Sequence, residues 1–320
     1  MRGPRTQTFC TALCVSMVGF GCGDGNFKSI DAVSISDAID IVEDMGQPLT
    51  EDAGPSFLDN PPNRLGGDRP AEYFVPAAYD AAEPWPLVIV LHGYSATGWL
   101  QDGYFGTSAL VDELGFFLIT PDGTKNSGGT NFWNGTDACC DFEGSNVDDV
   151  GYIVGLIDEL SQYFNIHQGR VYLLGHSNGG YMSYRLACDA SDRITALASL
   201  AGATFVDPAN CGASEPVSVL QIHGTQDDRV RYDGGLLQPS ALETVQMWAN
   251  TNGCSESSLQ SKALDIESNL VGAETDVKSW TDCAEGSGVE LWTIVDGSHV
   301  PALNDAFTPK VLEFMFAKVK

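Results

Sequence analysis

The stretch VYLLGHSNGGYMSYRLAC, residues 171–188, decides the fold of this chain. Its first four residues are apolar and predict a buried strand, and YMSYRLAC predicts a helix. GHSNGG lies between them, so Ser177 stands at a sharp strand-to-helix turn, flanked by Gly175 and Gly179. A side chain at either glycine would collide with the neighbouring strand or helix. This GxSxG pattern in this context is typical of a nucleophile elbow, which lifts the serine hydroxyl clear of the sheet.

The same alternation of strand and helix extends outward from this stretch in both directions. Short apolar runs, many of them ending at glycine, predict strands at 86–91, 116–120, 171–174, 194–200, 217–222 and 289–295. Longer amphipathic stretches predict helices at 147–164, 181–188, 240–250 and 305–319. Asp148 and Asp149 fall in the first turn of one of these helices, where we expect them to act as caps. The pattern predicts an α/β fold with a mostly parallel sheet and helices on both faces.

A serine hydroxyl becomes an effective nucleophile only when a base accepts its proton, so the chain must supply a histidine. His299 lies in DGSHVP, on the loop that leaves the last predicted strand, at the same carboxyl edge of the sheet as Ser177. The other four histidines fit this role less well. We interpret them as an elbow residue that points away, a surface residue and two strand-end residues of structural or oxyanion-loop type: His176, His167, His92 and His223.

The acid that orients the imidazole must lie at the same edge of the sheet. The strand 217–222 runs into HGTQDDRVRY, which supplies the adjacent Asp227 and Asp228. Asp296 competes with them, although its position before Gly297 is typical of a turn. The residues alone leave the choice between Asp227 and Asp228 open.

Several ordered motifs resemble one known family. They are LHGYSATG, TPDGT, FWNG with CC, VDDVGYI, RVYLLGHSNGGYMSYRLAC, IHGTQD with V and Y following, and a late GSH. Over residues 69–320 the chain resembles the extracellular polyhydroxybutyrate depolymerase-like esterases, which are related to bacterial feruloyl and acetyl xylan esterases of the LpqC type. The HGTxDxxVxY pattern of that family falls on Asp227, with Val230 and Tyr232 in place, and the family histidine falls on His299. This chain has DGSH where family members often have GGGH.

The resemblance implies an α/β-hydrolase fold and a serine esterase with a Ser177–His299–Asp227 triad. We expect the oxyanion hole to use the backbone N–H groups of Asn178 and Tyr94, because these positions follow the nucleophile and the first core strand. No metal or organic cofactor is expected. The predicted substrate is an ester, polymeric in kind, either a polyhydroxyalkanoate or a feruloyl or acetyl polysaccharide ester.

Other interpretations stay open beside this one. The chain could be a surface lipoprotein that binds a glycan or polymer without hydrolysing it, or a peptidase that uses the same triad. Five aromatic residues near the motifs could line an acyl or aryl pocket or belong to the core: Tyr94, Trp99, Phe132, Trp133 and Tyr181.

Composition excludes several classes of protein. The chain has 320 residues, of which 43 are acidic and 16 basic, for a net charge of -27. A surface of this charge repels phosphate backbones, so nucleic acid is not an expected partner. The sequence also lacks a phosphate loop, a GxGxxG opening a helix, and an HExxH helix, which excludes the usual nucleotide-dependent and zinc-protease designs.

The N-terminal region predicts export. Arg2 and Arg5 precede an apolar run of signal-peptide length, and Cys22 stands where a lipoprotein would be lipidated, so we expect residues 1–22 to be a signal. Residues 23–68 are acidic and poor in aromatics and predict a flexible linker, which leaves 69–320 as the catalytic domain. We expect a secreted or cell-surface protein that touches membrane only through a lipid on Cys22, and a monomer.

The cysteines are consistent with an oxidising compartment. Without the signal and Cys22, six remain. We expect Cys188 to pair with Cys211 and Cys254 with Cys283, because each pair brackets a local segment. The adjacent Cys139 and Cys140 would then bond to each other or exchange with the others.

Overall fold

A computed structural model describes residues 56–255, 258–260 and 263–320. The predicted signal, 1–22, and most of the predicted linker lie outside these residues. The described chain forms eleven strands, of which nine make one sheet and two a small separate ribbon. The strands are β1 (Glu72–Phe74), β2 (Trp85–Leu91), β3 (Phe117–Thr120), β4 (Thr124–Lys125), β5 (Asn131–Phe132), β6 (Ile166–His176), β7 (Ala196–Leu200), β8 (Ser218–Gly224), β9 (Ser258–Gln260), β10 (Thr275–Trp280) and β11 (Val289–Ile294).

The large sheet has the order β1-β3-β2-β6-β7-β8-β11-β10-β9. Six neighbouring strands, from β3 to β11, are parallel, whereas β1, β10 and β9 pair antiparallel at the two edges. The predicted fold class is therefore confirmed. The strand that carries the nucleophile elbow, β6, lies inside the parallel part, where both faces of the sheet are covered.

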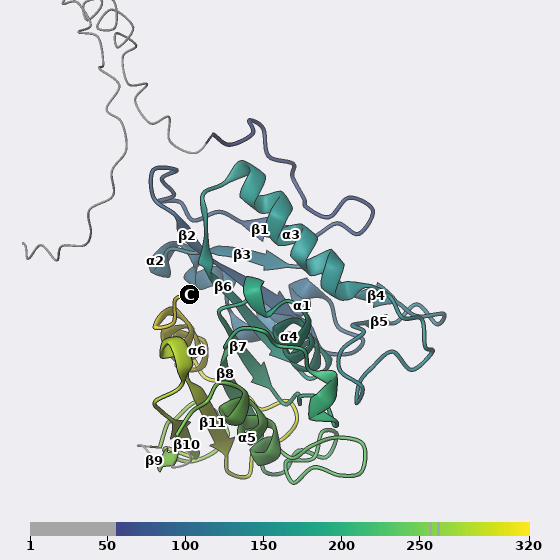
Figure 1. Ribbon diagram of the computed structural model, residues 1–320, viewed down its shortest axis with the longest axis vertical. Helices are drawn as coiled ribbons and strands as arrows, with labels where there is room; N and C mark the ends of the chain where they lie inside the picture. The colour runs from purple at the N-terminus through teal and green to yellow at the C-terminus, as the bar shows by residue number, and fades with distance from the viewer. Residues whose placement is uncertain (1–55, 256–257, 261–262) are drawn as a thin grey trace, which may run out of the picture. The chain divides into compact units, whose positions relative to one another are not determined.

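Helices cover both faces of this sheet. They are α1 (Gly98–Phe105), α2 (Val111–Leu114), α3 (Asp149–Tyr163), α4 (Asn178–Asp189), α5 (Ala241–Thr251) and α6 (Phe307–Phe316), with short 3₁₀ turns η1 (Ser108–Leu110), η2 (Ser191–Arg193), η3 (Pro208–Asn210) and η4 (Ala284–Gly286). Figure 1 shows α3, α4 and α5 over one face. Their buried side chains share one core cluster, and those of α1, α2 and α6 share a second cluster on the other face.

The sequence of β2 explains why the sheet has two covered faces. Leu87, Ile89 and Leu91 belong to the cluster under α3, α4 and α5, while Val88 and Val90 belong to the opposite cluster. Because successive side chains of a strand point to opposite faces, a strand buried on both sides must be apolar at every position. The result is a three-layer α/β/α arrangement.

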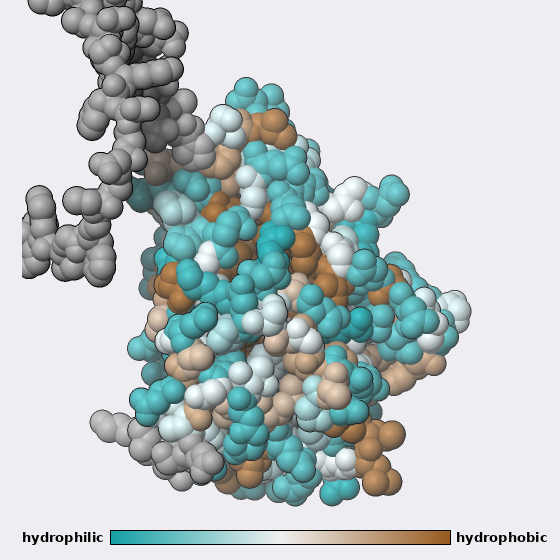
Figure 2. Space-filling view, in the orientation of Figure 1, coloured by the Kyte–Doolittle hydropathy of each residue, from teal (hydrophilic) through white to brown (hydrophobic). Residues whose placement is uncertain are grey.

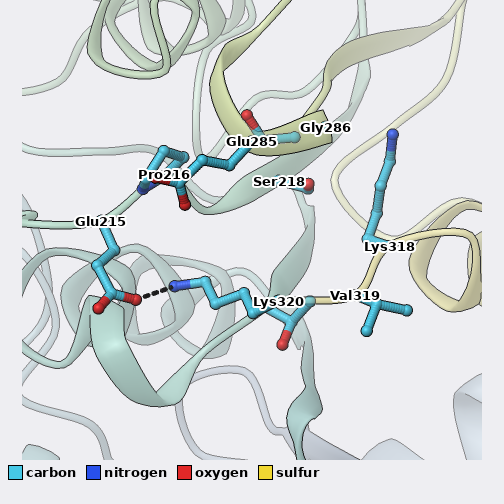
Figure 3. A pocket seen from close by; sticks show the side chains of 10 residues that line it. Glu215, Pro216, Ser218, Glu285, Gly286, Lys318, Val319 and Lys320 are labelled. Atoms are coloured by element: carbon cyan, nitrogen blue, oxygen red, sulfur yellow. Dashed lines mark hydrogen bonds and ion pairs between the residues drawn. The ribbon is translucent and has the colours of Figure 1, made fainter. Parts of the chain in front are cut away.

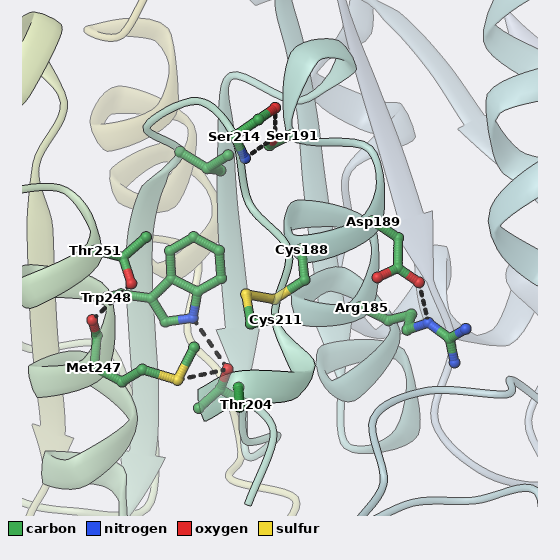
Figure 4. Close-up of a disulfide and its surroundings, with 12 residues drawn as sticks. Arg185, Cys188, Asp189, Ser191, Thr204, Cys211, Ser214, Met247, Trp248 and Thr251 are labelled. Atoms are coloured by element: carbon green, nitrogen blue, oxygen red, sulfur yellow. Dashed lines mark hydrogen bonds and ion pairs between the residues drawn. A yellow bond between two sulfur atoms is a disulfide. The ribbon is translucent and has the colours of Figure 1, made fainter. Parts of the chain in front are cut away.

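Three disulfides lie within the described residues: Cys139–Cys140, Cys188–Cys211 and Cys254–Cys283. The two expected pairs, Cys188–Cys211 and Cys254–Cys283, are thus present. Figure 4 shows Cys188 of α4 bonded to Cys211, with Trp248 of α5 donating its indole N–H to Thr204 nearby. This disulfide ties the loop after β7 to the helix that begins at the elbow.

The described part of the predicted linker packs against the sheet. Leu65 is fully buried in the same core cluster as α3, and its backbone pairs with that of Ala71. The backbone N–H of Leu58 donates to Gln162 at the end of α3. The packed region therefore extends upstream of residue 69.

The described surface is mixed in polarity. On the face drawn in Figure 2, apolar residues form small separate patches between polar ones. Within the described residues, no helix combines the length and the hydrophobicity that crossing a membrane requires.

Candidate active site

The elbow places Ser177 between β6 and α4 in a left-handed backbone conformation, with φ 53° and ψ −117°. A non-glycine residue adopts such angles only where its surroundings enforce them. The two flanking glycines are those surroundings. A Cβ at Gly175 would lie 2.2 Å from the carbonyl oxygen of Gly179, and one at Gly179 would lie 2.0 Å from that of Leu91. No other residue fits at either position, as the sequence predicted.

The structure brings the three predicted triad residues together from three loops at the carboxyl edge of the sheet. His299 Nε2 lies 2.9 Å from Ser177 Oγ, and His299 Nδ1 lies 2.8 Å from Asp227 Oδ2. The Asp227 side chain is fully buried, and that of His299 is 15% exposed. The arrangement allows proton transfer from the serine hydroxyl to an imidazole oriented by a carboxylate.

The two alternative acids lie elsewhere. The side chain of Asp228 is 80% exposed, and its carboxylate faces Arg229. Asp296 has φ 62° in an exposed turn, with its backbone N–H donating to Thr225. Asp227 is therefore the carboxylate that contacts His299.

Asp227 is surrounded by hydrogen-bond donors. Its Oδ1 accepts from the backbone N–H groups of Arg229 and Val230, at 2.9 and 2.8 Å. Burial alone would raise the pKa of Asp227, but hydrogen bonds from His223 and His299 outweigh burial and hold that pKa well below its usual value. The carboxyl group therefore stays ionised.

His223 belongs to a buried polar chain that the sequence analysis missed. Its Nε2 lies 2.7 Å from the carbonyl oxygen of Val230 and 3.3 Å from Asp227 Oδ2, while its Nδ1 faces Gln221 Nε2 at 3.0 Å. Gln221 also donates to the carbonyl of Gly202, and its Oε1 accepts from the Tyr184 hydroxyl at 2.7 Å. The sequence did contain a signal for this chain of hydrogen bonds, because residues 221 and 223 place two polar side chains on one face of a buried strand.

The hydrogen bonds of this buried polar chain fix the tautomer of His223. The carbonyl of Gly202 can only accept, so the Gln221 amide must turn its nitrogen toward it and toward His223 Nδ1. Nδ1 is then an acceptor, so the ring proton lies on Nε2, which faces Val230 and Asp227. His223 thus donates toward the carboxylate that orients His299.

His176 contacts the loop that carries His299, although it is not the predicted base. Its Nε2 lies 2.9 Å from the backbone oxygen of His299, and the two rings are 5.2 Å apart. Burial lowers the pKa of His176 to about 4, so the ring is neutral at pH 7 and donates to this carbonyl. The elbow and the loop of His299 are thereby joined directly.

Two predicted oxyanion donors flank the serine. Asn178 begins α4, and the loop of Tyr94 lies beside the elbow, since a Cβ on Gly93 would be 3.6 Å from that of Ser177. Within the described residues, the backbone N–H groups of Tyr94 and Asn178 donate to no protein acceptor. Both are thus available to a ligand oxygen.

His92, Trp133 and Asn178 hold the loop of Tyr94, the predicted oxyanion loop, in place. Asn178 makes two hydrogen bonds with the backbone of Trp133, at 2.8 and 2.9 Å, and the Trp133 indole donates to the carbonyl of His92. His92 Nε2 accepts from Gly123, so its Nδ1 carries the proton that bonds the carbonyl of Gly93. These side-chain roles were not visible in the sequence, because they join four segments.

Asp149 is not a simple cap as predicted. Asp148 alone caps α3, with its carboxylate accepting from Gly151. Asp149 is buried and instead accepts from Arg69 Nη1 at 2.5 Å and from the backbone of Asn134. It joins the segment before β1 to the loop after β5.

The five aromatic residues separate into two groups. Phe132, Trp133 and Tyr181 are buried, while Tyr94 and Trp99 are 37% and 75% exposed. Tyr181 packs with Val230 and Cys139 close to the elbow. A pocket of about 680 Å³ opens beside Trp99.

Another cavity, of about 310 Å³, lies at the amino ends of the parallel strands, opposite the carboxyl edge that carries Ser177 (Figure 3). Its lining includes Ser218, the first residue of β8, and the C-terminal Lys318 and Lys320. It contains none of the triad residues. Within the described residues, no group of three or more histidine, cysteine, aspartate or glutamate side chains is arranged to hold a metal ion.

Known proteins resemble this chain along most of its length. "Feruloyl esterase B" from Piromyces equi is 29% identical over 238 residues, which cover 70% of this chain and 41% of that protein. "Feruloyl esterase D" from Neurospora crassa is 25% identical over 252 residues, covering 74% of this chain and 77% of that protein. In three curated relatives the match spans only 41%, 56% and 63% of their length.

A solved structure confirms the fold. The "Acetyl xylan esterase from Aspergillus awamori" superimposes with a TM-score of 0.56 at 17% identity, covering 78% of this chain and 94% of that one. The family described as "Putative esterase" matches residues 62–283, which include Ser177 and Asp227. Since this match covers more than half of the sequence, the chain belongs to that esterase family.

Proposed function

We propose that this protein is a serine esterase that hydrolyses carboxylic esters through an acyl-enzyme. The observation that carries the proposal is the continuous contact from Ser177 Oγ through His299 to Asp227 Oδ2, at 2.9 and 2.8 Å. Family membership and the named feruloyl and acetyl xylan esterases among its relatives support ester bonds as the substrate class.

The residues suggest a standard sequence of steps. Ser177 Oγ attacks the ester carbonyl carbon while His299 Nε2 accepts the hydroxyl proton. The N–H groups of Asn178 and Tyr94 bond the resulting oxyanion, each contributing about 3 kcal/mol. The C–O bond to the alcohol then breaks, and His299 returns the proton to the departing alcohol oxygen. Water, deprotonated by His299, then attacks the acyl-serine carbonyl carbon. The bond from that carbon to Ser177 Oγ breaks, His299 returns the proton to Oγ, and the acid is released.

Ser177→Ala tests this mechanism. Removing the nucleophile should lower kcat on p-nitrophenyl acetate by at least about a thousand-fold, while the circular dichroism spectrum stays unchanged. The wild-type protein should react with a fluorophosphonate probe at Ser177, and the variant should not. Full turnover by the folded variant would contradict the proposal. A wild-type protein that the probe does not label would favour the alternative, a polymer-binding protein on a hydrolase scaffold.

We propose an esterified plant polysaccharide as the natural substrate class. The named activities of the relatives support feruloyl or acetyl groups on a glycan rather than a polyhydroxyalkanoate or a peptide. Product release from feruloylated arabinoxylan, acetylxylan, poly(3-hydroxybutyrate) and a peptide amide, measured side by side, decides among them. Faster release from the polyester or the amide than from both glycans would overturn this assignment.

We also propose that the protein acts outside the cytoplasm, with residues 1–22 as a signal and Cys22 as a lipid attachment site. The three disulfides support an oxidising compartment. Mass spectrometry of the mature N-terminus in the native host tests both parts. An unprocessed Met1 terminus would contradict export, and an unmodified Cys22 at a processed terminus would contradict lipidation alone.

A further inference from the structure

Trp99 is exposed in a way that packing does not explain. It is 75% exposed, while the other five tryptophans of the chain are buried or half-buried. A large aromatic side chain that stays in solvent contributes no packing or hydrophobic stabilisation unless a ligand or partner covers it. The ring therefore offers a flat apolar surface to a ligand.

The position of Trp99 is fixed by its neighbour. A Cβ at Gly98 would lie 2.2 Å from the carbonyl oxygen of Thr120, and the backbone N–H of Gly98 donates to Asp122 at 2.7 Å. The first turn of α1 is thus pressed onto the end of β3. The backbone from which the Trp99 side chain projects is therefore held in place.

Trp99 lines a pocket of about 680 Å³ at the carboxyl edge of the sheet. Its wall includes Thr120 and Asp122 at the end of β3, and Glu72, whose backbone pairs with Thr120. Two strand spacings separate β3 from β6, so the pocket lies about 10 Å or more to one side of Ser177. A short run of sugar residues spans this distance.

The charges of the pocket wall favour an uncharged ligand. Its ionisable residues are three cations and three anions: Arg64, Arg69, Lys125, Asp68, Glu72 and Asp122. Arg64 pairs with Glu72, and Arg69 pairs with Asp149. Although the whole chain has a net charge of -27, the positive and negative charges of this wall are equal in number, and the wall is rich in hydrogen-bonding groups.

Asn131 adds an unused acceptor to the same wall. It is 7% exposed, and its Nδ2 donates to the carbonyl of Ala96 at 2.9 Å. Its Oδ1 has no hydrogen-bond partner within the described residues. A buried polar atom left unpaired is costly, and a ligand hydroxyl is one group that could satisfy it.

We propose that this pocket is a binding subsite for the neutral glycan chain of the substrate, with Trp99 stacking on a sugar ring. The electron-rich face of the indole attracts the polarised C–H groups of the sugar, and the surrounding side chains bond its hydroxyls. The inference rests on the proposed esterase function. It predicts that the chain recognises the polysaccharide at a distance from the ester.

The test separates glycan binding from ester chemistry. Trp99→Ala should lower kcat/KM on feruloylated arabinoxylan by about ten-fold, through KM, and should change kcat/KM on p-nitrophenyl acetate by less than about two-fold. Leu100→Ala is the matched control, because Leu100 is the next residue of α1, is 51% exposed and does not line the pocket. It should leave both substrates unaffected.

Binding is measured separately on Ser177→Ala protein by electrophoresis in gels that contain unesterified arabinoxylan. Retardation that disappears when Trp99→Ala is added supports the subsite. Ser177→Ala protein that the gel does not retard, or retardation that persists after Trp99→Ala is added, overturns the subsite and leaves the proposed esterase function standing. Equal losses on both substrates in Trp99→Ala, or the same loss in Leu100→Ala, also overturn it. Trp99-dependent binding to poly(3-hydroxybutyrate) granules without retardation by arabinoxylan would show a polyester subsite instead.

Discussion

Asp227 depends on residues that its own loop does not contain. The backbone N–H groups of Arg229 and Val230 serve one carboxylate oxygen, and His299 with His223 serves the other. The tautomer of His223 is in turn fixed by Gln221, whose orientation is fixed by Gly202. The orientation of the proposed base therefore rests on a strand interior as well as on a loop.

His223→Phe should weaken catalysis while leaving the nucleophile in place. A hydrogen bond to a charged group contributes about 1.5–3 kcal/mol, so kcat on p-nitrophenyl acetate should fall about ten- to hundred-fold with little change in KM. The hydrogen bond from His223 is the largest of the interactions that lower the pKa of Asp227, so this pKa should rise without the donor, and the acid limb of the kcat/KM profile should move to higher pH.

The same substitution at His167, which lies in β6 far from the elbow, provides the control. His167→Phe should leave kcat and the pH profile unchanged. If folded His223→Phe protein keeps both the wild-type kcat and the wild-type acid limb, His223 has a packing role only. A loss of kcat without any shift of the acid limb would also contradict a role of His223 that acts through the Asp227 carboxylate.

At the level of single residues, the sequence could predict the groups whose roles follow from type and place in the chain. Ser177 was visible because only a tight turn explains its glycines, and His299 because it follows the last parallel strand. His176, His223 and Asn178 act through side-chain contacts between distant segments, which no local pattern reveals. Their catalytic or positioning roles remain predictions to be tested.

At the level of elements, a glycine of α4 and a glycine of α3 differ in how much space surrounds them. At Gly179, a Cβ would meet the backbone of β2 at 2.0 Å, whereas Gly155 in α3 is exposed with nothing within 4 Å of such a Cβ. Backbone atoms cannot move aside as a side chain can. The elbow glycine is thus required by packing, and the α3 glycine is not.

Two alanine substitutions test this contrast. Gly179→Ala should lower the free energy of unfolding by about 3 kcal/mol or more, because β2 and α4 must separate. Gly155→Ala should raise it by up to about 1 kcal/mol, since alanine is the better helix former. Urea denaturation measures both. A Gly179→Ala protein as stable as the wild type would contradict the close packing at the elbow.

Elements were predictable where their residues repeat one pattern. The parallel strands have continuous apolar runs, and all six lie where the sequence placed them or within a few residues. β10 and α1 were missed. β10 mixes buried, half-exposed and exposed positions, as an antiparallel strand near the edge does. α1 has only eight residues and is interrupted by glycine. Neither pattern stands out from a loop.

For the molecule as a whole, the sequence predicted the layers correctly but placed the start of the packed region too late. Residues 56–68 are polar and look like linker, yet Leu65 is fully buried. A single apolar residue that anchors a polar segment has no periodicity to reveal it. The disulfides were easier, because Cys188–Cys211 and Cys254–Cys283 each close a short local segment.

Stability of the whole molecule should depend on pH through its buried histidines. Burial lowers the pKa of His176 to about 4, below the usual 6.5, and also lowers that of His92. Between these values the unfolded chain binds protons that the folded protein excludes. The stabilisation that comes from keeping His176 neutral is therefore complete above pH 6.5 and is lost as the pH drops toward 4, so the free energy of unfolding falls by about 1.4 kcal/mol per pH unit for this histidine. His92 acts in the same direction. The low pKa of Asp227 acts in a more acidic range, since its contribution is lost only below the usual 3.8.

His176→Gln isolates one of these protons, because the glutamine amide can still donate to the carbonyl of His299 but does not titrate. Its unfolding free energy should therefore fall less steeply than that of the wild type below pH 6.5, by about one proton in the slope. Above that pH, the difference between the two proteins should be constant and report only the change in packing. Urea denaturation across this range measures the slopes. Identical slopes would mean that His176 takes up its proton equally in the folded and unfolded states, and that its ring is not held neutral by burial.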